Sequence, residues 1–163
     1  MNNKQIIIYT DGSSLGNPGK GGWATILTTL GKILELSGGY RMTTNNRMEL
    51  TAIIKGLEAL KEPCNNITIF TDSQFITNSI NKGWLDNWTK NGWKKSNKKD
   101  VLNIDLWQKF IPLWQKHNIK FIWIEGHIGI PNNERCDFLC RQAAENAVDI
   151  DFGYENLMSY KKV

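Results

Sequence analysis

Short runs of branched and aromatic residues, separated by glycine-, asparagine- and serine-rich breaks, dominate the start of the chain. Residues 6–10, 21–28 and 32–40 form three such runs, and each predicts a β-strand. Their short connections predict an antiparallel meander. The glycine-rich segment 12–19 joins the first two runs. It has neither the Gly-Lys-Ser/Thr of a P-loop nor the spacing of a dinucleotide fingerprint, so we interpret it as a hairpin connection and not as a phosphate cradle.

The spacing of the hydrophobic residues then changes from every second residue, as in a strand, to every third or fourth residue, as in a helix. The apolar positions of this segment share one helical face: Leu50, Ile53, Ile54, Leu57 and Leu60. They predict a helix that starts among the capping candidates 43–46 and ends near residue 60. A further strand is predicted at 66–71. A helix between two strands predicts a βαβ unit, in which the strands are parallel and the crossover is right-handed.

The second half of the chain reads as two further helices, at 73–81 and 100–118, a strand at 119–124 and a last long helix at 134–147. Pro112 removes a backbone donor and should kink or interrupt the helix that contains it. The fold class is therefore α/β: a five-stranded mixed sheet, with three antiparallel and two parallel strands, flanked by helices on both faces. We expect one domain over residues 1–148 and a C-terminal tail without strong secondary structure at 149–163.

Composition narrows the class of protein. The three cysteines form no CxxC pair, and the one-turn spacing of Cys136 and Cys140 suits packing better than a disulfide or a zinc site. No apolar run approaches the roughly 18 residues of a membrane span. The N-terminus is too short and polar for a signal peptide. We therefore expect a soluble, monomeric protein of the reducing cytoplasm that does not bind a membrane.

The charge is unevenly distributed. The chain carries a net charge of +4, but residues 82–99 contain six lysines and one acid, Asp86, so the rest of the chain sums to −1. Three tryptophans (Trp84, Trp88 and Trp93) lie among these lysines. A solvated charged face and core-anchoring tryptophans are the simple alternatives. Basic and aromatic residues together favour contact with nucleic acid, through phosphates and stacked bases.

Four carboxylates have a local explanation each, and the fold brings them together. Asp11 could start a turn, Glu49 could form a capping box with Asn46, Asp72 could cap the next helix, and Asp137 could interact with a helix dipole in a first turn. However, Asp11 and Asp72 follow parallel strands, at the sheet edge where α/β proteins bind ligands. Glu49 and Asp137 are expected near the same edge.

Clustered carboxylates repel one another unless cations lie between them. An all-oxygen ligand set favours Mg²⁺ or Mn²⁺ over zinc. Two such ions could activate a water and stabilise the leaving oxygen of a phosphodiester. His127, in a glycine-flanked loop near this edge, could move protons near neutral pH, although a lone histidine is more often structural.

The ordered motifs resemble those of bacterial type 1 ribonucleases H over about residues 4–146. The matching segments are YTDGS at 9–13, GNPG at 16–19, TTNNRMEL at 43–50, TDSQ at 71–74, GW at 92–93, DLW at 105–107, GH at 126–127 and NERCD at 133–137. The resemblance implies the ribonuclease H-like fold. It also implies a Mg²⁺-dependent endonuclease, with two ions per site and Mn²⁺ as a substitute. Such an enzyme cuts the RNA strand of RNA–DNA hybrids and leaves 5′-phosphate and 3′-hydroxyl ends.

The resemblance also implies roles for individual residues. Asp11, Glu49, Asp72 and Asp137 match the metal-binding carboxylates, and His127 matches the catalytic histidine. The residues that match the RNA side of the minor groove are Gly12, Asn17, Asn45, Asn46 and Gln74, where a 2′-hydroxyl distinguishes RNA from DNA. Those that match the DNA-strand channel and phosphate pocket are Thr44, Asn87 and Trp88, with the segment 82–99 as a basic protrusion.

Glu125 departs from the pattern, because the relatives carry a lysine before the Gly-His pair. It adds negative charge near the site and could change affinity for the hybrid. Two alternative functions stay open: a hybrid- or duplex-binding module that has lost catalysis, and a transposase- or exonuclease-like protein of the same fold that acts on DNA. The complete carboxylate set argues against the first, and the asparagine-rich groove set argues against the second.

Overall fold

A single mixed sheet of five strands runs through the protein. The computed structural model describes residues 4–126 and 129–161. The strands are β1 (Ile6–Ser14), β2 (Gly19–Thr29), β3 (Lys32–Thr43), β4 (Ile67–Thr71) and β5 (Ile119–Trp123). Their order across the sheet is β3-β2-β1-β4-β5, with antiparallel β1–β2 and β2–β3 pairs and parallel β1–β4 and β4–β5 pairs. The predicted sheet is confirmed, although β3 extends further than expected, to Thr43.

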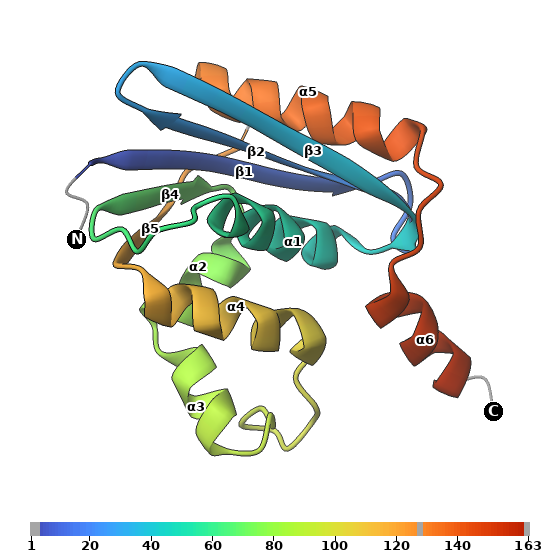
Figure 1. Ribbon diagram of the computed structural model, residues 1–163. Coiled ribbons are helices and arrows are strands. Elements are labelled where there is room, and N and C mark those ends of the chain that lie inside the picture. Colours follow the sequence, from blue (N-terminus) through green and yellow to red (C-terminus); the bar gives the residue numbers. More distant parts are fainter. Residues whose placement is uncertain (1–3, 127–128, 162–163) are drawn as a thin grey trace.

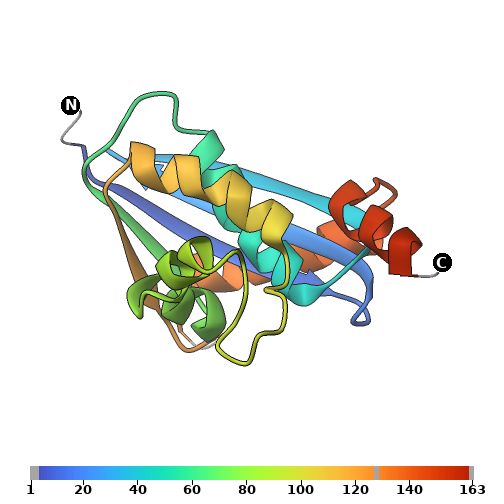
Figure 2. The ribbon, with the colours of Figure 1, turned by 90° about the horizontal axis from the view of Figure 1, so that it is seen from below.

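Helices cover both faces of this sheet. They are α1 (Asn45–Glu58), α2 (Gln74–Asn81), α3 (Trp84–Lys90), α4 (Ile104–Lys116), α5 (Pro131–Glu145) and α6 (Phe152–Lys161). α5 lies alone on one face, whereas α1 to α4 lie on the other (Figure 1). Seen from below, α4 crosses over α1 (Figure 2). α3 and the loop 91–103 project away from the sheet (Figure 1).

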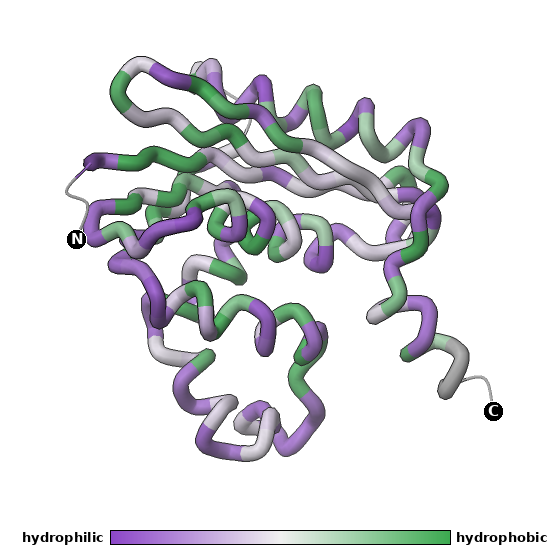
Figure 3. The backbone as a smooth tube through the Cα atoms, in the orientation of Figure 1, coloured by the Kyte–Doolittle hydropathy of each residue, from purple (hydrophilic) through white to green (hydrophobic). Residues whose placement is uncertain are grey.

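The two faces have separate apolar cores. The larger joins β1 and β4 to α1 and α4, and includes fully buried Ile8, Ile53 and Phe110. The smaller lies between β2 and α5, where Cys136 and Cys140 pack against Ala24 and Ile26. All three cysteines are buried and free, so the packing role expected for this pair is confirmed. Figure 3 shows hydrophobic residues concentrated along the sheet and the helix faces that meet it.

Pro112 does not end its helix, contrary to one of the two outcomes that we expected. α4 continues from Ile104 to Lys116 with Pro112 inside it. A proline leaves the carbonyl four residues earlier without its helical donor, and here that residue, Gln108, is exposed. Water can therefore satisfy the carbonyl, which explains why the helix tolerates the proline.

The prediction of an unstructured tail at 149–163 is wrong, because α6 occupies most of it. The buried Arg47 guanidinium binds Asp151, just before α6, and Asp105 at the start of α4, at 2.8 Å each. Arg41 of β3 makes a two-pronged ion pair with Glu155 of α6 (3.0 and 3.1 Å). Long-range ion pairs of this kind leave no local sequence pattern, so the helix was missed.

Among the described residues, none of the helices combines the length and the apolar character that crossing a membrane would require.

Candidate active site

Two aspartates meet at one edge of the sheet because their strands are parallel and in register. Thr10 of β1 pairs with Thr71 of β4, and Asp11 and Asp72 follow these two residues. The Asp11 side chain is buried, and its Oδ1 accepts a hydrogen bond of 2.8 Å from the Gly12 N–H. The strand-end position is confirmed for Asp72, but β1 continues to Ser14, so Asp11 lies within its strand, just past the end of the pairing with β4.

Glu49 reaches the same point from α1. The capping-box interpretation is wrong: the N-cap of α1 is Thr44, whose hydroxyl accepts from the Arg47 N–H. Gly12 brings β1 into contact with the first turn of α1, since a Cβ at Gly12 would lie 2.8 Å from the Met48 Cβ and closer still to the backbone of Glu49. Carboxylate oxygens of Asp11, Glu49 and Asp72 consequently lie within 4.8 Å of one another.

Asp72 lies between β4 and α2, and groups from other segments contact it. The N-cap of α2 is Ser73, whose hydroxyl accepts from the Ile76 N–H, so Asp72 is not the cap. The Trp123 indole donates to the Asp72 carbonyl (3.1 Å). A Cβ at Gly126 would lie 3.0 Å from Asp72 Oδ2, so the loop after β5 runs directly past this carboxylate. The Asp72 carboxylate lies in the cluster with Asp11 and Glu49.

Asp137 approaches from the opposite face of the sheet. It lies in the second turn of α5, not the first as expected, because the helix begins at Pro131. The close approach of α5 to β2 depends on Gly22, where a Cβ would lie 2.8 Å from the Ala144 nitrogen. Ligand atoms of Asp11, Asp137 and Cys140 lie within 4.8 Å of one another. Arg141, one turn on, donates to Asp137 Oδ1 at 3.1 Å.

The site is electrostatically unfavourable for ionised carboxyls. Burial, followed by the negative charge of Asp72, raises the pKa of Asp11 from 3.8 to about 8, against the lowering effect of the Gly12 N–H. Burial and the charges of Asp11 and Asp72 raise the pKa of Glu49 well above its usual value. Among the described residues, Glu49 Oε2 is one of few buried side-chain oxygens without a hydrogen-bond partner. Such oxygens are the ones that a cation would satisfy.

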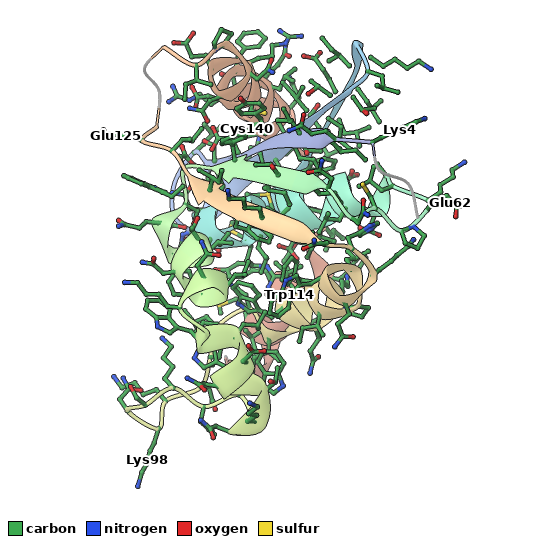
Figure 4. All side chains as sticks on the ribbon, turned by 90° about the vertical axis from the view of Figure 1, so that its left-hand side faces the viewer. Lys4, Glu62, Lys98, Trp114, Glu125 and Cys140 are labelled. Carbon is green, nitrogen blue, oxygen red and sulfur yellow. The ribbon has the colours of Figure 1, made fainter. Side chains whose placement is uncertain are left out.

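Thiols do not belong to this ligand set. Burial and the negative charge of Asp11 raise the pKa of Cys140 far above its usual value, and burial does the same for Cys136. Both thiols therefore stay protonated, and Figure 4 shows Cys140 where α5 meets the sheet. The donors are oxygens, as Mg²⁺ and Mn²⁺ prefer. His127 lies outside the described residues, and Glu125 is exposed beyond the end of β5 (Figure 4).

Comparison with known proteins agrees with the fold. The family model for RNase H matches residues 3–145, which is most of the chain. The chain belongs to the RNase H family. A curated relative named Ribonuclease H, from Nitratidesulfovibrio vulgaris (strain DP4), is 50% identical over 155 residues, which cover 94% of this chain and 99% of that relative. The resemblance to bacterial type 1 enzymes is thereby confirmed.

Solved structures show the same fold. LC9-RNase H1, described as a type 1 RNase H with the type 2 active-site motif, matches with a TM-score of 0.79 and 27% identity, over 96% of this chain and 82% of that one. LC11-RNase H1, solved in complex with an RNA/DNA hybrid, has a TM-score of 0.61 and 24% identity, over 86% of this chain and 97% of that one. RNases H depend on divalent metal ions, and the acidic residues of this member can hold one.

Several residues that were predicted to bind substrate lie side by side in this RNase H. The Asn45 N–H donates to Asn17 Oδ1 (3.1 Å), which ties the β1–β2 loop to the start of α1. Thr44 and Asn46 flank Asn45, and Asn17, Asn45 and Asn46 are exposed. Gly12 is buried against α1, so only its backbone is available to a ligand. Gln74 is exposed at the start of α2.

The basic protrusion of this RNase H combines a groove with a core anchor. Asn87 and Trp88 line a groove with Phe75, Trp84 and Lys95. Trp88 is only 7% exposed and packs edge-on against Trp107, with ring centroids 5.8 Å apart. The core-anchor alternative is thus confirmed for Trp88, although the residue also lines the groove. Lys98 projects from the outer end of the loop (Figure 4).

Sequence reasoning missed Arg47, Asn103 and the whole of α6 as neighbours of the substrate-binding set. Asn103 is the N-cap of α4 and accepts a hydrogen bond from Arg47 Nη1 (3.3 Å). It lines a groove with Thr44 and Asn17. Its φ is +61°, a conformation that asparagine tolerates better than most residues.

Proposed function

We propose that this RNase H is an endonuclease that hydrolyses the RNA strand of RNA–DNA hybrids and leaves 5′-phosphate and 3′-hydroxyl ends. The observation that carries the proposal is the meeting of three carboxylates within 4.8 Å at the sheet edge, with Asp137 beside them from α5. Four carboxylates facing a polyanion would weaken binding, so a role in catalysis explains them better than a role in binding alone. The curated relatives named Ribonuclease H support the same activity.

The residues present fit divalent cations. Asp11 belongs to two groups of donors, one with Glu49 and Asp72 and one with Asp137, so all four carboxylates would be available to hold divalent cations. We propose Mg²⁺ as the resident ion, with Mn²⁺ as a substitute. Such ions supply Lewis-acid activation of water and stabilise charge on the leaving oxygen. Asp11, Glu49, Asp72 and Asp137 would hold them.

The protein's own groups perform the remaining tasks. β1 and β4 fix Asp11 and Asp72 rigidly in register, and the Gly12 contact fixes Glu49 against them. This geometry orients the carboxylates before substrate arrives, so little reorganisation is needed at the reacting phosphate. We assign to His127 the proton transfer to the leaving 3′-oxygen, which an imidazole can perform near neutral pH.

Recognition of the hybrid would divide between the two strands. Exposed amides at Asn17, Asn45, Asn46 and Gln74, with the Gly12 backbone, would donate to or accept from 2′-hydroxyls of the RNA strand in the minor groove. Thr44, Asn87 and Trp88 would contact the DNA strand. Lysines of the protrusion would add contacts to phosphates that do not depend on sequence.

The decisive experiment offers labelled RNA–DNA hybrid, duplex RNA and duplex DNA with Mg²⁺ or with a chelator. We expect cleavage of the hybrid alone, and only with Mg²⁺. Asp11→Asn should lose turnover and still bind hybrid, while His127→Ala should be slower but active. Binding of hybrid without any cleavage would instead support the binding-module alternative, and cleavage of duplex DNA would support the transposase- or exonuclease-like one.

We also propose that the protein is a cytoplasmic monomer. Three buried, free thiols suit a reducing compartment. Cell fractionation and sedimentation of the purified protein test these two statements.

A further inference from the structure

The C-terminal helix forms one wall of a groove that the proposed substrate-binding residues line from the other side. The groove has a volume of about 310 Å³. Its polar wall includes Asn17, Thr44 and Asn46, and its apolar wall includes Leu102 of the segment before α4 and Leu157 and Met158 of α6. We call it the terminal groove. It is continuous with the proposed nucleic-acid surface, because three of its residues belong to that surface.

α6 is held firmly in this position. Arg47 joins it to α4 through Asp151 and Asp105, and the Thr43 hydroxyl donates to Asp151 Oδ2 (2.7 Å). Gly153 allows the close approach, since a Cβ there would lie 2.6 Å from Arg47 Nη2 and closer still to the Asp105 carboxylate. The ion pair of Arg41 with Glu155 adds a second attachment. The apolar wall is therefore a preformed part of the fold.

The chemistry of the two walls is complementary to one particular nucleic-acid backbone. Leu157 is 45% exposed and Leu102 is 60% exposed, so both offer apolar surface to a ligand. A ribose whose 2′-hydroxyl pointed at this apolar wall would find no hydrogen-bond partner there, whereas a deoxyribose has no such group. Thr44 on the opposite wall, which is proposed above to contact the DNA strand, can bind a phosphate or sugar oxygen of that strand. The groove suits the sugar–phosphate backbone of a DNA strand.

We propose that Leu157 and Met158 of α6 contact a deoxyribose of the DNA strand, and that this contact helps the enzyme to reject RNA at that position. The inference rests on the proposed function, because it extends the same substrate surface by one further element. It makes α6 part of the substrate interface, and Leu157 a residue that determines specificity for the DNA strand.

Steady-state cleavage of hybrid by Leu157→Ala and Met158→Ala tests the contact. We expect each variant to raise KM about fivefold with kcat unchanged, which corresponds to about 1 kcal/mol at 1.4 kcal/mol per tenfold. Phe152→Ala is the matched control, since Phe152 is a 65% exposed apolar residue of the same helix that does not line the groove. The control should keep the KM of the wild-type protein. Thermal melting verifies that all three variants fold.

A second measurement addresses specificity. In an Asp11→Asn background, the ratio of affinities for hybrid and for duplex RNA should fall when Leu157 is changed to Gln, because the amide can pair with a 2′-hydroxyl. An unchanged KM in both alanine variants, an equal rise in the Phe152 control, or an unchanged affinity ratio would each overturn the inference. If wild-type protein fails to cleave hybrid, the proposed function itself fails, so the two failures are distinguishable.

Discussion

Neutralising Asp11 should stabilise the metal-free protein, and the gain should depend on pH. The buried Asp11 carboxyl has a pKa of about 8, well above the ordinary 3.8 of an aspartate. Between these two values the folded state holds a proton that the unfolded chain releases. The contribution of this proton to the free energy of unfolding is therefore fully present below pH 4 and is lost as pH rises to 8. Asp11→Asn removes this loss, and its amide oxygen can still accept from the Gly12 N–H.

The magnitude follows from the linkage. Within the window, one ionisable group changes the free energy of unfolding by at most about 1.36 kcal/mol per pH unit. A domain of this length shifts its Tm by about 3 °C per kcal/mol. The Tm of Asp11→Asn, measured against that of the wild-type protein, should thus rise by up to about 4 °C per pH unit from pH 4 to pH 8. Above pH 8 the difference should level off.

Thermal melts in chelator across this pH range supply the measurement. Asp86→Asn is the control, because Asp86 is an exposed aspartate in the first turn of α3. Its Tm difference from wild type should hardly change with pH. Adding Mg²⁺ at pH 8 should raise the Tm of the wild-type protein more than that of Asp11→Asn, because the ion binds the ionised cluster. A pH-independent difference for Asp11→Asn would refute the electrostatic reasoning.

Three further changes test the framework around the site. Gly12→Ala forces β1 away from α1. We therefore expect the free energy of unfolding, measured by chemical denaturation, to fall by about 1–3 kcal/mol, and kcat to fall as well. Wild-type values for both would contradict the close-contact role. Arg47→Met leaves the Asp151 carboxylate buried and unpaired, which should cost about 3–5 kcal/mol. Asp151→Asn in that background should recover part of the loss, and no recovery would argue against the ion pair. Lys95→Ala and Lys98→Ala should each raise KM for hybrid and reduce its salt dependence by about one phosphate contact; an unchanged salt slope would remove the lysines from the interface.

Much of the fold was predictable because it rests on local rules. Alternating strands and the β–helix–β order place Asp11 and Asp72 together before any contact is known. Glu49 needed one more fact, the Gly12 contact, and its local explanation as a capping residue competed with the correct placement. Thr44, two residues before Asn46, caps the helix instead.

The missed features depend on contacts between distant segments. α6 has no clear amphipathic pattern, and its position comes from Arg47, Gly153 and Glu155, whose partners lie far away in the sequence. A charged residue such as Arg47 in the first turn of a helix resembles an ordinary surface residue until its two carboxylate partners are located. Trp88 is similar: its burial against Trp107 is invisible in a lysine-rich segment. Local patterns therefore predict the elements, whereas the grooves between them require the structure.

The placement of Asp137 on α5 has a consequence for synthesis in the cell. Asp11, Glu49 and Asp72 precede α5 in the chain, and α5 packs on the opposite face of the sheet (Figure 1). Synthesis runs from the N-terminus, and domains generally fold as units. A nascent chain that still holds α5 in the ribosome has an incomplete set of carboxylates. The nuclease thus becomes competent only after α5 has been released, and products of premature termination before residue 131 lack the full site.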